Sequence, residues 1–313
     1  MSSRTRPAAA AALLAAACLT FPAGAARAAA VPDFSGARAM ELVEAQCALG
    51  PRHPGSEGIA ALRDLITAAA REAGLAVVRL PFTAEHPLEG GEVAGWNIVV
   101  SAGPAGGERL WLGAHYDTRP VADMEIDPAA RAVPIIGAND GGSGVAVLLH
   151  LIELLGRTPP PQGVDLLFFD LEDAGRPAEP ATYCLGSRHL ARTWQDFGNP
   201  LAGGTPRGLV LLDMVGDRDL TIPMERYSLA HAPAWTRAVF DRAAALGLEA
   251  FDPRPGRAVV DDHLPFLERG IPAVDLIDFD YPAWHTAGDV PAACSAASLE
   301  QVGRLVTDLV YRP

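Results

Sequence analysis

The segment 164–173 reads Val-Asp-Leu-Leu-Phe-Phe-Asp-Leu-Glu-Asp, an apolar run that passes directly into a group of acids. A short, nearly continuous apolar run is typical of a strand that is buried on both faces of a parallel sheet. In open α/β sheets, the ligand crevice lies beyond the carboxyl ends of such strands. The segment therefore predicts a buried strand that delivers Glu172 and Asp173 to a binding site.

Working outward, four more apolar runs of the same kind are bounded by Gly and Pro. They cover residues 96–100, 110–114, 209–212 and 273–277. The last three run directly into His115, Asp213 and Asp278. Because the carboxyl ends of parallel strands meet at one edge of a sheet, we expect these polar side chains to gather there.

Helical periodicity separates these strands. It covers residues 36–49, 57–73, 143–156, 185–193, 233–247 and 298–311. Alternation of strand and helix patterns without an internal repeat or a long linker favours one layered domain. We predict a single three-layer α/β domain whose central mixed, largely parallel sheet is flanked by helices.

The composition narrows the classes of protein. With 49% hydrophobic and 20% charged residues in 313, the chain is neither disordered, collagen-like nor a coiled coil. The formal charge of −13 argues against a nucleic-acid partner, because such proteins bind through surplus basic charge. All 25 basic residues are Arg, which excludes Schiff-base chemistry on Lys.

The first thirty residues have the layout of a secretory signal peptide. Arg4 and Arg6 precede an apolar run over 8–21, which is shorter than the ~20 residues of a membrane span. Small residues follow up to Ala30, so we expect cleavage before Val31 and a secreted or periplasmic catalytic domain over 31–313. Lipoprotein anchoring at Cys18 is disfavoured, because Ala15 stands where a larger aliphatic residue is usual.

Three cysteines remain after that cleavage: Cys47, Cys184 and Cys294. Three thiols cannot all pair, so disulfides are not the framework of this fold, and at most one bridge forms. The sequence does not select a pair, nor does it indicate an oligomeric state.

Candidate site residues lie at the expected strand ends and in a Gly-rich stretch, 137–144, that contains Asp140 and opens a helix. Imidazole and carboxylate groups without a thiolate suit catalytic Zn²⁺. Each acid alone could equally be a helix cap or a solvated turn residue, so the residues by themselves leave the metal open. The Gly-rich stretch is not a phosphate loop, because it lacks the Gly-Lys-Ser/Thr ending.

Several ordered segments together resemble the zinc-dependent glutaminyl cyclases and the wider group of zinc aminopeptidases that share their fold. The resemblance spans roughly residues 34–310. The segments, besides the acids and imidazoles above, are Arg52-His-Pro-Gly-Ser-Glu-Gly58, Gly186-Ser-Arg-His-Leu-Ala191, Leu211-Leu-Asp-Met-Val-Gly216, Asp261-Asp-His-Leu-Pro-Phe-Leu267 and Trp284-His-Thr286.

This resemblance implies roles for individual residues. Asp140, Asp173 and His285 match the ligands of the cyclase zinc, and Glu172 matches the general base. In aminopeptidases, residues that match His115 and Asp213 hold a second zinc, with the counterpart of Asp140 bridging and that of Asp117 orienting His115. Both positions are occupied here, but cyclases that hold one zinc resemble this sequence at these positions as well. One zinc is therefore expected, and a second is left open.

Further matches favour cyclisation over hydrolysis. Trp284 precedes the ligand His285 as in the cyclases, where it walls the substrate pocket. Asp261 matches an acid that joins Asp213 in a carboxyl network, and Asp275 stands where animal cyclases have His, so we expect substrate contact there. If these three acids converge, they cannot all ionise, and at least one proton would be shared.

The resulting prediction is a glutaminyl-peptide cyclotransferase that converts N-terminal Gln of peptides to pyroglutamate and releases ammonia. The alternatives are a di-zinc aminopeptidase and an inactive peptide-binding relative. Two departures from the animal enzymes concern substrate range: Asp173 is one methylene shorter than their Glu, and the loop 174–180 lacks their aromatic residue.

Overall fold

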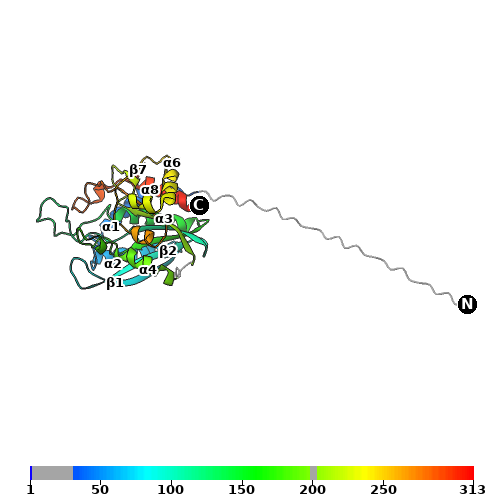
Figure 1. The fold of residues 1–313 in the computed structure, drawn as a ribbon, viewed down its shortest axis with the longest axis horizontal. Helices are drawn as coiled ribbons and strands as arrows, with labels where there is room; N and C mark the ends of the chain where they lie inside the picture. Colours follow the sequence, from blue (N-terminus) through cyan, green and yellow to red (C-terminus); the bar gives the residue numbers. More distant parts are fainter. Residues whose placement is uncertain (2–30, 198–202) are drawn as a thin grey trace.

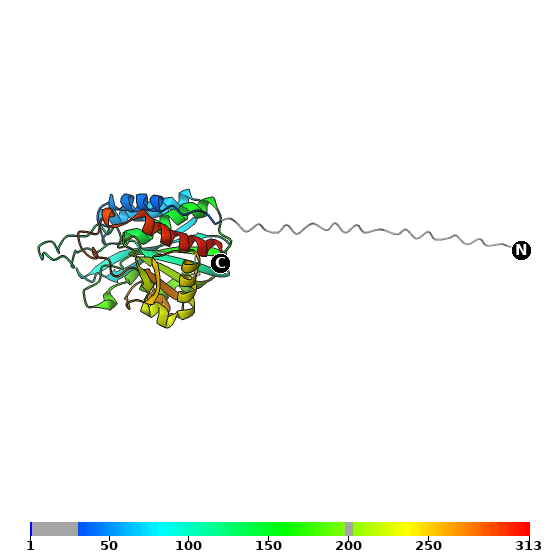
Figure 2. The same ribbon diagram turned by 90° about the horizontal axis from the view of Figure 1, so that it is seen from above.

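The computed structural model describes all residues except 2–30 and 198–202. The predicted signal peptide therefore lies outside the described residues. A six-stranded sheet in the order β1-β2-β4-β3-β5-β8 forms the middle layer, with helices on both sides (Figures 1 and 2). The strands are β1 (Ala76–Glu85), β2 (Glu92–Ala102), β3 (Glu108–His115), β4 (Gly163–Phe169), β5 (Thr205–Asp213) and β8 (Ala273–Ile277).

The sheet is mixed, as predicted. The strands β4, β3, β5 and β8 run parallel to one another, whereas β1 and β2 pair antiparallel at one edge. The strand β1 was not among the predicted strands. Its Pro81 cannot donate a ladder hydrogen bond and is tolerated because β1 is an edge strand. A small second sheet pairs β6 (Ile222–Met224) with β7 (Phe251–Pro255).

Alternate residues of each strand face opposite helical layers. On one face, α1 (Gly36–Cys47), α2 (Glu57–Glu72), α3 (Gly142–Arg157) and α8 (Ala296–Tyr311) cover the sheet (Figure 2). On the other, α4 (Leu185–Phe197) and α7 (Leu264–Leu267) pack on residues such as Trp111 and Leu211. The helices α5 (Arg226–His231) and α6 (Pro233–Ala245) lie beside β8, and two 3₁₀ turns occupy Pro180–Thr182 and Pro291–Ala293.

Glycines at the start of α3 bring its first turn against the carboxyl ends of β3 and β5. A Cβ on Gly144 would lie 2.2 Å from the Leu212 carbonyl oxygen, and one on Gly141 would lie 2.6 Å from that of His115. Only residues without a side chain permit this approach. The Gly-rich stretch therefore places Asp140 above the strand ends.

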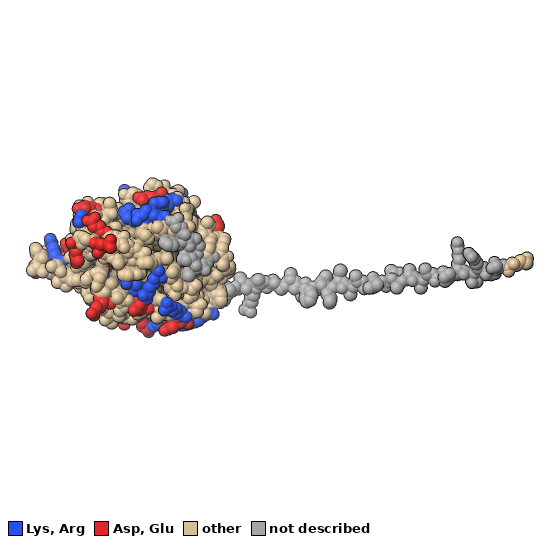
Figure 3. Space-filling model, turned by 90° about the horizontal axis from the view of Figure 1, so that it is seen from below, with Lys and Arg blue, Asp and Glu red and all other residues tan. Residues whose placement is uncertain are grey.

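Three further features concern the described residues as a whole. Among the described residues, no helix combines the length and the apolar character needed to cross a bilayer. On the face drawn in Figure 3, arginines are interspersed with acidic side chains and form no continuous basic surface. Cys47, Cys184 and Cys294 carry free thiols.

Candidate active site

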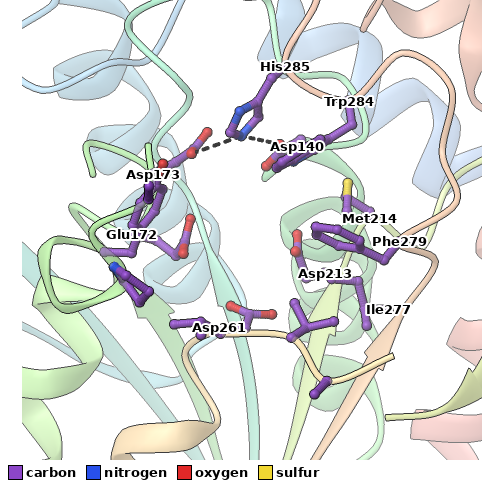
Figure 4. Close-up of a pocket in the computed structure, with 16 residues that line it drawn as sticks. Asp140, Glu172, Asp173, Asp213, Met214, Asp261, Ile277, Phe279, Trp284 and His285 are labelled. Carbon is purple, nitrogen blue, oxygen red and sulfur yellow. Dashed lines mark ion pairs between the residues drawn. The ribbon is translucent and has the colours of Figure 1, made fainter. Parts of the chain in front are cut away.

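A cavity of about 210 Å³ opens at the carboxyl edge of the parallel strands (Figure 4). It is smaller than the ~300–1,000 Å³ typical of drug-sized ligands, so it suits a single side chain. Its walls combine polar and apolar residues, including seven predicted site residues. The polar ones are Asp140, Glu172, Asp173, Asp213, Asp261 and His285, and the apolar ones include Met214, Val259, Ile277, Phe279 and Trp284.

Asp140, Asp173 and His285 come together although they lie far apart in the sequence. One potential ligand atom from each falls within 4.8 Å of the others. His285 Nε2 lies 3.1 Å from Asp173 Oδ1 and 3.7 Å from Asp140 Oδ2. The Oδ2 atoms of both aspartates are buried and accept no hydrogen bond. Two carboxylates with free lone pairs and one imidazole form a donor set that fits zinc.

Asp117 supports this group from below. Its carboxylate accepts hydrogen bonds from the backbone N–H of Glu172 and of Asp173, both at 3.1 Å. Its Oδ1 also lies 3.6 Å from His115 Nδ1, which is within ion-pair range but too long for a hydrogen bond. Asp117 therefore fixes the turn after β4 that carries two predicted site residues.

Asp289, which the sequence analysis did not identify, holds the loop of Asp140 in the same manner. Its two oxygens accept hydrogen bonds from the backbone N–H of Asn139 (2.8 Å) and of Asp140 (3.1 Å). The Tyr281 hydroxyl donates to it at 2.8 Å. An isolated acid in a loop gives no sequence signal for this role.

Asp123 orients His285 and was likewise missed. The Nδ1–H of His285 donates to Asp123 Oδ1 at 3.0 Å, so that Nε2 faces Asp173. Arg119 donates to both oxygens of Asp123 and, through Nη1, to the Asp173 carbonyl at 2.8 Å. A carboxylate behind a ligand imidazole fixes its tautomer and raises its basicity.

His115 forms a second group with Asp140 and Asp213. Its Nε2 lies 3.2 Å from Asp140 Oδ1 and 3.1 Å from Asp213 Oδ1. These are the residues for which the resemblance implied a second metal with Asp140 as the bridge. The three ligand atoms lie within 4.8 Å of one another.

Glu172 points into the cavity from the turn after β4, facing Asp261 (Figure 4). The Cys184 thiol donates to Glu172 Oε1 at 3.3 Å, which leaves the other carboxylate oxygen for a substrate. The indole of Trp284 stacks on the His285 ring with centroids 4.0 Å apart, and Phe279 packs against it at 4.9 Å. These rings form an apolar wall beside the ligand group.

Two of the predicted acids at this edge do not line the cavity. Asp275 does not line the cavity: it is fully buried in the middle of β8, with its Oδ2 3.6 Å from His263 Nδ1. One carboxylate oxygen of Asp275 lies within 4.8 Å of ligand atoms of Asp261 and His263. Asp278 turns away from the cavity and accepts hydrogen bonds from the backbone N–H of Thr221 and Asp280.

Burial and mutual repulsion shape the ionisation of these acids. Burial raises the pKa of Glu172 well above its usual value, and the nearby charges of Asp173 and Asp261 act in the same direction against that of His115. Burial and the charge of Asp213 raise the pKa of Asp261 to about 7. Asp275 also has a strongly raised pKa, because it is buried near Asp261 and Glu225. A bound divalent cation would lower the pKa values of adjacent carboxyls.

The pKa values of His285 and His115 are raised, although burial alone would lower them. Burial lowers the pKa of His285, but the charge of Asp173 and the hydrogen bond to Asp123 raise it to about 10. The pKa of His115 likewise rises, despite burial, because Asp117, Asp140 and Asp213 surround it.

The backbone around the cavity is strained. The described non-glycine residues with positive φ all line the cavity or adjoin Glu172 in sequence or space: Leu171 (57°), Ala178 (65°), Cys184 (59°), Met214 (46°) and His285 (55°). Such conformations cost about 1–3 kcal/mol each and concentrate at functional sites.

Comparisons with known proteins agree with this geometry. Residues 97–310 match peptidase family M28. The mouse glutaminyl-peptide cyclotransferase-like protein is 30% identical, over 82% of this chain and 70% of its own length.

Solved structures give the same result. Glutaminyl cyclase from Bacteroides thetaiotaomicron, bound to N-acetylhistamine, superposes with a TM-score of 0.83 and is 32% identical, covering 90% of this chain and 99% of the other. A Zn-dependent exopeptidase from Parabacteroides distasonis has the same TM-score and identity, covering 91% and 100%. The chain therefore belongs to peptidase family M28 and, within it, is an enzyme of the glutaminyl cyclase type.

Proposed function

We propose that this enzyme converts the N-terminal Gln of peptides to pyroglutamate and releases ammonia. The observation that carries the proposal is the arrangement of one small cavity: a ligand group of Asp140, Asp173 and His285 on one side, and Glu172 with Asp261 facing it. The Trp284 indole supplies an apolar wall for the side chain of one residue.

The cofactor is one zinc ion held by Asp140, Asp173 and His285. When bound, zinc supplies Lewis-acid polarisation of the γ-carbonyl. The donor set and the unbonded Oδ2 atoms of both aspartates support this assignment.

In the reaction, the α-nitrogen of the substrate attacks its own γ-carbonyl carbon, the bond from that carbon to the side-chain nitrogen breaks, and ammonia leaves. The substrate reacts as the neutral amine, after its α-ammonium has lost one proton to solvent. As the ring bond forms, Glu172 removes a second proton from the attacking nitrogen and returns it to the departing nitrogen, which leaves as NH3. Asp261 and Asp213, as neighbouring acids in the cavity, bind the α-amino group and share a proton. Because nucleophile and carbonyl belong to one folded residue, the cavity needs only to fix their orientation.

The alternative is hydrolysis of the N-terminal residue by two zinc ions. The grouping of His115 with Asp140 and Asp213 favours this reading, since it offers a second set of ligands beside the first. Hydrolysis would use Glu172 to deprotonate water instead of the substrate amine.

One experiment separates these functions. Ammonia release from a Gln-peptide is measured beside anilide release from leucine anilide, with the zinc content of the same preparation. We expect ammonia release with one zinc per chain. Anilide release without ammonia and with two zinc ions would establish the peptidase, and inactivity toward the Gln-peptide would contradict the proposed cyclisation.

Export from the cytoplasm is also proposed, from the signal-like sequence over 1–30 and cleavage before Val31. N-terminal sequencing of the protein recovered from cell fractions tests the cleavage point.

A further inference from the structure

Glu225, just before α5, is a buried carboxylate that the proposed reaction does not use. It is 1% exposed, yet it accepts five hydrogen bonds. Three come from α5: Tyr227 N–H at 2.8 Å, Ser228 N–H at 2.6 Å and the Ser228 hydroxyl at 2.8 Å. The other two come from the Val259 N–H at 3.0 Å and from His263 Nε2 at 3.1 Å. Every partner is a donor, so this carboxylate ties α5 to the segment over 257–263.

Val259 is part of a thin wall. With Ile277 and Phe279, it lines both the reaction cavity and a second cavity of about 80 Å³ behind it, which Glu225 also lines. Space behind a wall lets that wall retreat, because no atoms there resist it. The hydrogen bond from Val259 N–H to Glu225 opposes this movement.

His263 extends the connection to the acids below the cavity. Its imidazole is fully buried, with Nε2 donating to Glu225 and Nδ1 3.6 Å from Asp275 Oδ2. Ligand atoms of Asp261, His263 and Asp275 lie within 4.8 Å of one another. Asp261 itself lies two residues before His263 and lines the cavity. His263 is therefore held by Glu225, and the short backbone segment that it shares with Asp261 carries that acid to the cavity.

We propose that Glu225 and His263 are a pair of positioning residues for the reaction at this cavity. Glu225 fixes the wall at Val259 and, through the side chain of His263, the backbone segment that carries Asp261, so that the N-terminal residue of the peptide is held with its amine near Glu172. The inference rests on the proposed function for the identity of the substrate. It does not require either residue to touch the substrate.

The test replaces Glu225 by Gln, a side chain of nearly the same size. Glu225→Gln places an amide N–H among five donors, so several of these hydrogen bonds are lost. We expect kcat to fall at least ~10-fold, with a smaller change in KM and an unchanged zinc content, because small misplacements in an active site cost up to ~100-fold in rate. Hydrogen exchange at the Val259 amide should accelerate by a similar factor.

Two variants of His263 keep the proposal testable if Glu225→Gln does not fold. His263→Gln retains an N–H that can reach Glu225, whereas His263→Leu removes it. We expect the Gln variant to keep most of the wild-type kcat and the Leu variant to lose it. This rescue separates positioning from simple loss of packing.

The matched control is Glu153→Gln on α3. Glu153 also pairs with an imidazole, that of His150, at 2.9 Å, but it lies in the helical layer away from the cavity. This variant should leave kcat, KM and exchange at Val259 unchanged.

The proposal is overturned if folded Glu225→Gln and His263→Leu proteins keep wild-type kcat and KM, or if exchange at Val259 does not change. Failure of the proposed function has a different signature: the wild-type enzyme would release no ammonia from a Gln-peptide. The same variants would then be measured with leucine anilide, and the exchange measurement needs no substrate at all.

Discussion

The two sides of the cavity differ in how their carboxylates are held. On what we call the anchored side, which comprises Asp140, Asp173 and His285, each residue is fixed by a further acid: Asp289, Asp117 or Asp123. On what we call the acid-pair side, Asp213 and Asp261 line the cavity, and the buried Asp275 lies beside Asp261 with neither oxygen accepting a hydrogen bond. The same residue type is therefore oriented on one side and left to share protons on the other.

This difference separates two tasks. Ligands for a cation must keep their lone pairs aimed at one point, which requires supports with fixed geometry. Groups that receive an ammonium and redistribute its proton benefit from raised pKa values, such as the value of about 7 for Asp261. Substitutions on the two sides should therefore impair the enzyme in different ways.

The largest effect is expected from Asp140→Asn on the anchored side. An amide is a poor replacement for a carboxylate ligand, so zinc content and ammonia release should both fall to background. Metal analysis and the ammonia assay check this together. The matched control is Asp278→Asn, an acid at a neighbouring strand end that turns away from the cavity, and this variant should retain zinc and activity. Full zinc occupancy in Asp140→Asn would contradict the ligand assignment.

Glu172→Gln, between the two sides, should lose activity without losing metal. Removing a general base typically costs ~100-fold or more in kcat. The measurement is kcat for a Gln-peptide, with the zinc content of the same sample. Glu179→Gln, which changes an exposed acid in the adjoining loop, serves as the control. Retained activity in Glu172→Gln would remove Glu172 from the mechanism.

Asp123→Asn tests whether the anchored side depends on its supports. Loss of the charge behind His285 should weaken zinc affinity by about 10–100-fold, as for other acids behind ligand imidazoles. Competition with a chelator of known affinity measures this. An unchanged affinity would show that the Asp123–His285 hydrogen bond does not contribute to metal binding.

The smallest effect concerns the acid-pair side and pH. The pKa of Asp261 is raised to about 7 in the folded chain, so the folded state binds its proton more tightly than the unfolded state does. Its contribution to stability is present below pH ~4 and is lost as the pH rises through 7. Chelated protein should therefore melt at a lower temperature at pH 8 than at pH 5, and Asp261→Asn should flatten that slope. Equal slopes in both proteins would contradict the assignment.

Much of the fold could be predicted from the sequence, because strands buried on both faces leave continuous apolar runs. The turn from Phe169 into Glu172 and Asp173 is an example, since one strand end delivers both residues to the cavity. The strand β1 was missed because Pro81 interrupts its pattern, and α5 and α7 are too short to show a helical period.

The supports of the site were harder to predict. Asp123, Asp289 and Glu225 are single acids in loops, and what distinguishes them is the set of N–H groups that converge on each carboxylate. Such convergence depends on the tertiary structure. The same reasoning explains Asp275, whose sequence position next to the site did not reveal that it lies beneath Asp261.

The strained backbone at Leu171, Met214 and His285 has a consequence for engineering a more heat-resistant form of this enzyme. Replacement of Leu171 or Met214 by Gly would relieve about 1–3 kcal/mol of strain but would also remove a fully buried side chain, which typically costs about 2–5 kcal/mol. Replacement of His285 would remove a ligand of the proposed zinc site. Substitutions in α1 and α2, which do not line the cavity, are therefore the better positions for added heat resistance.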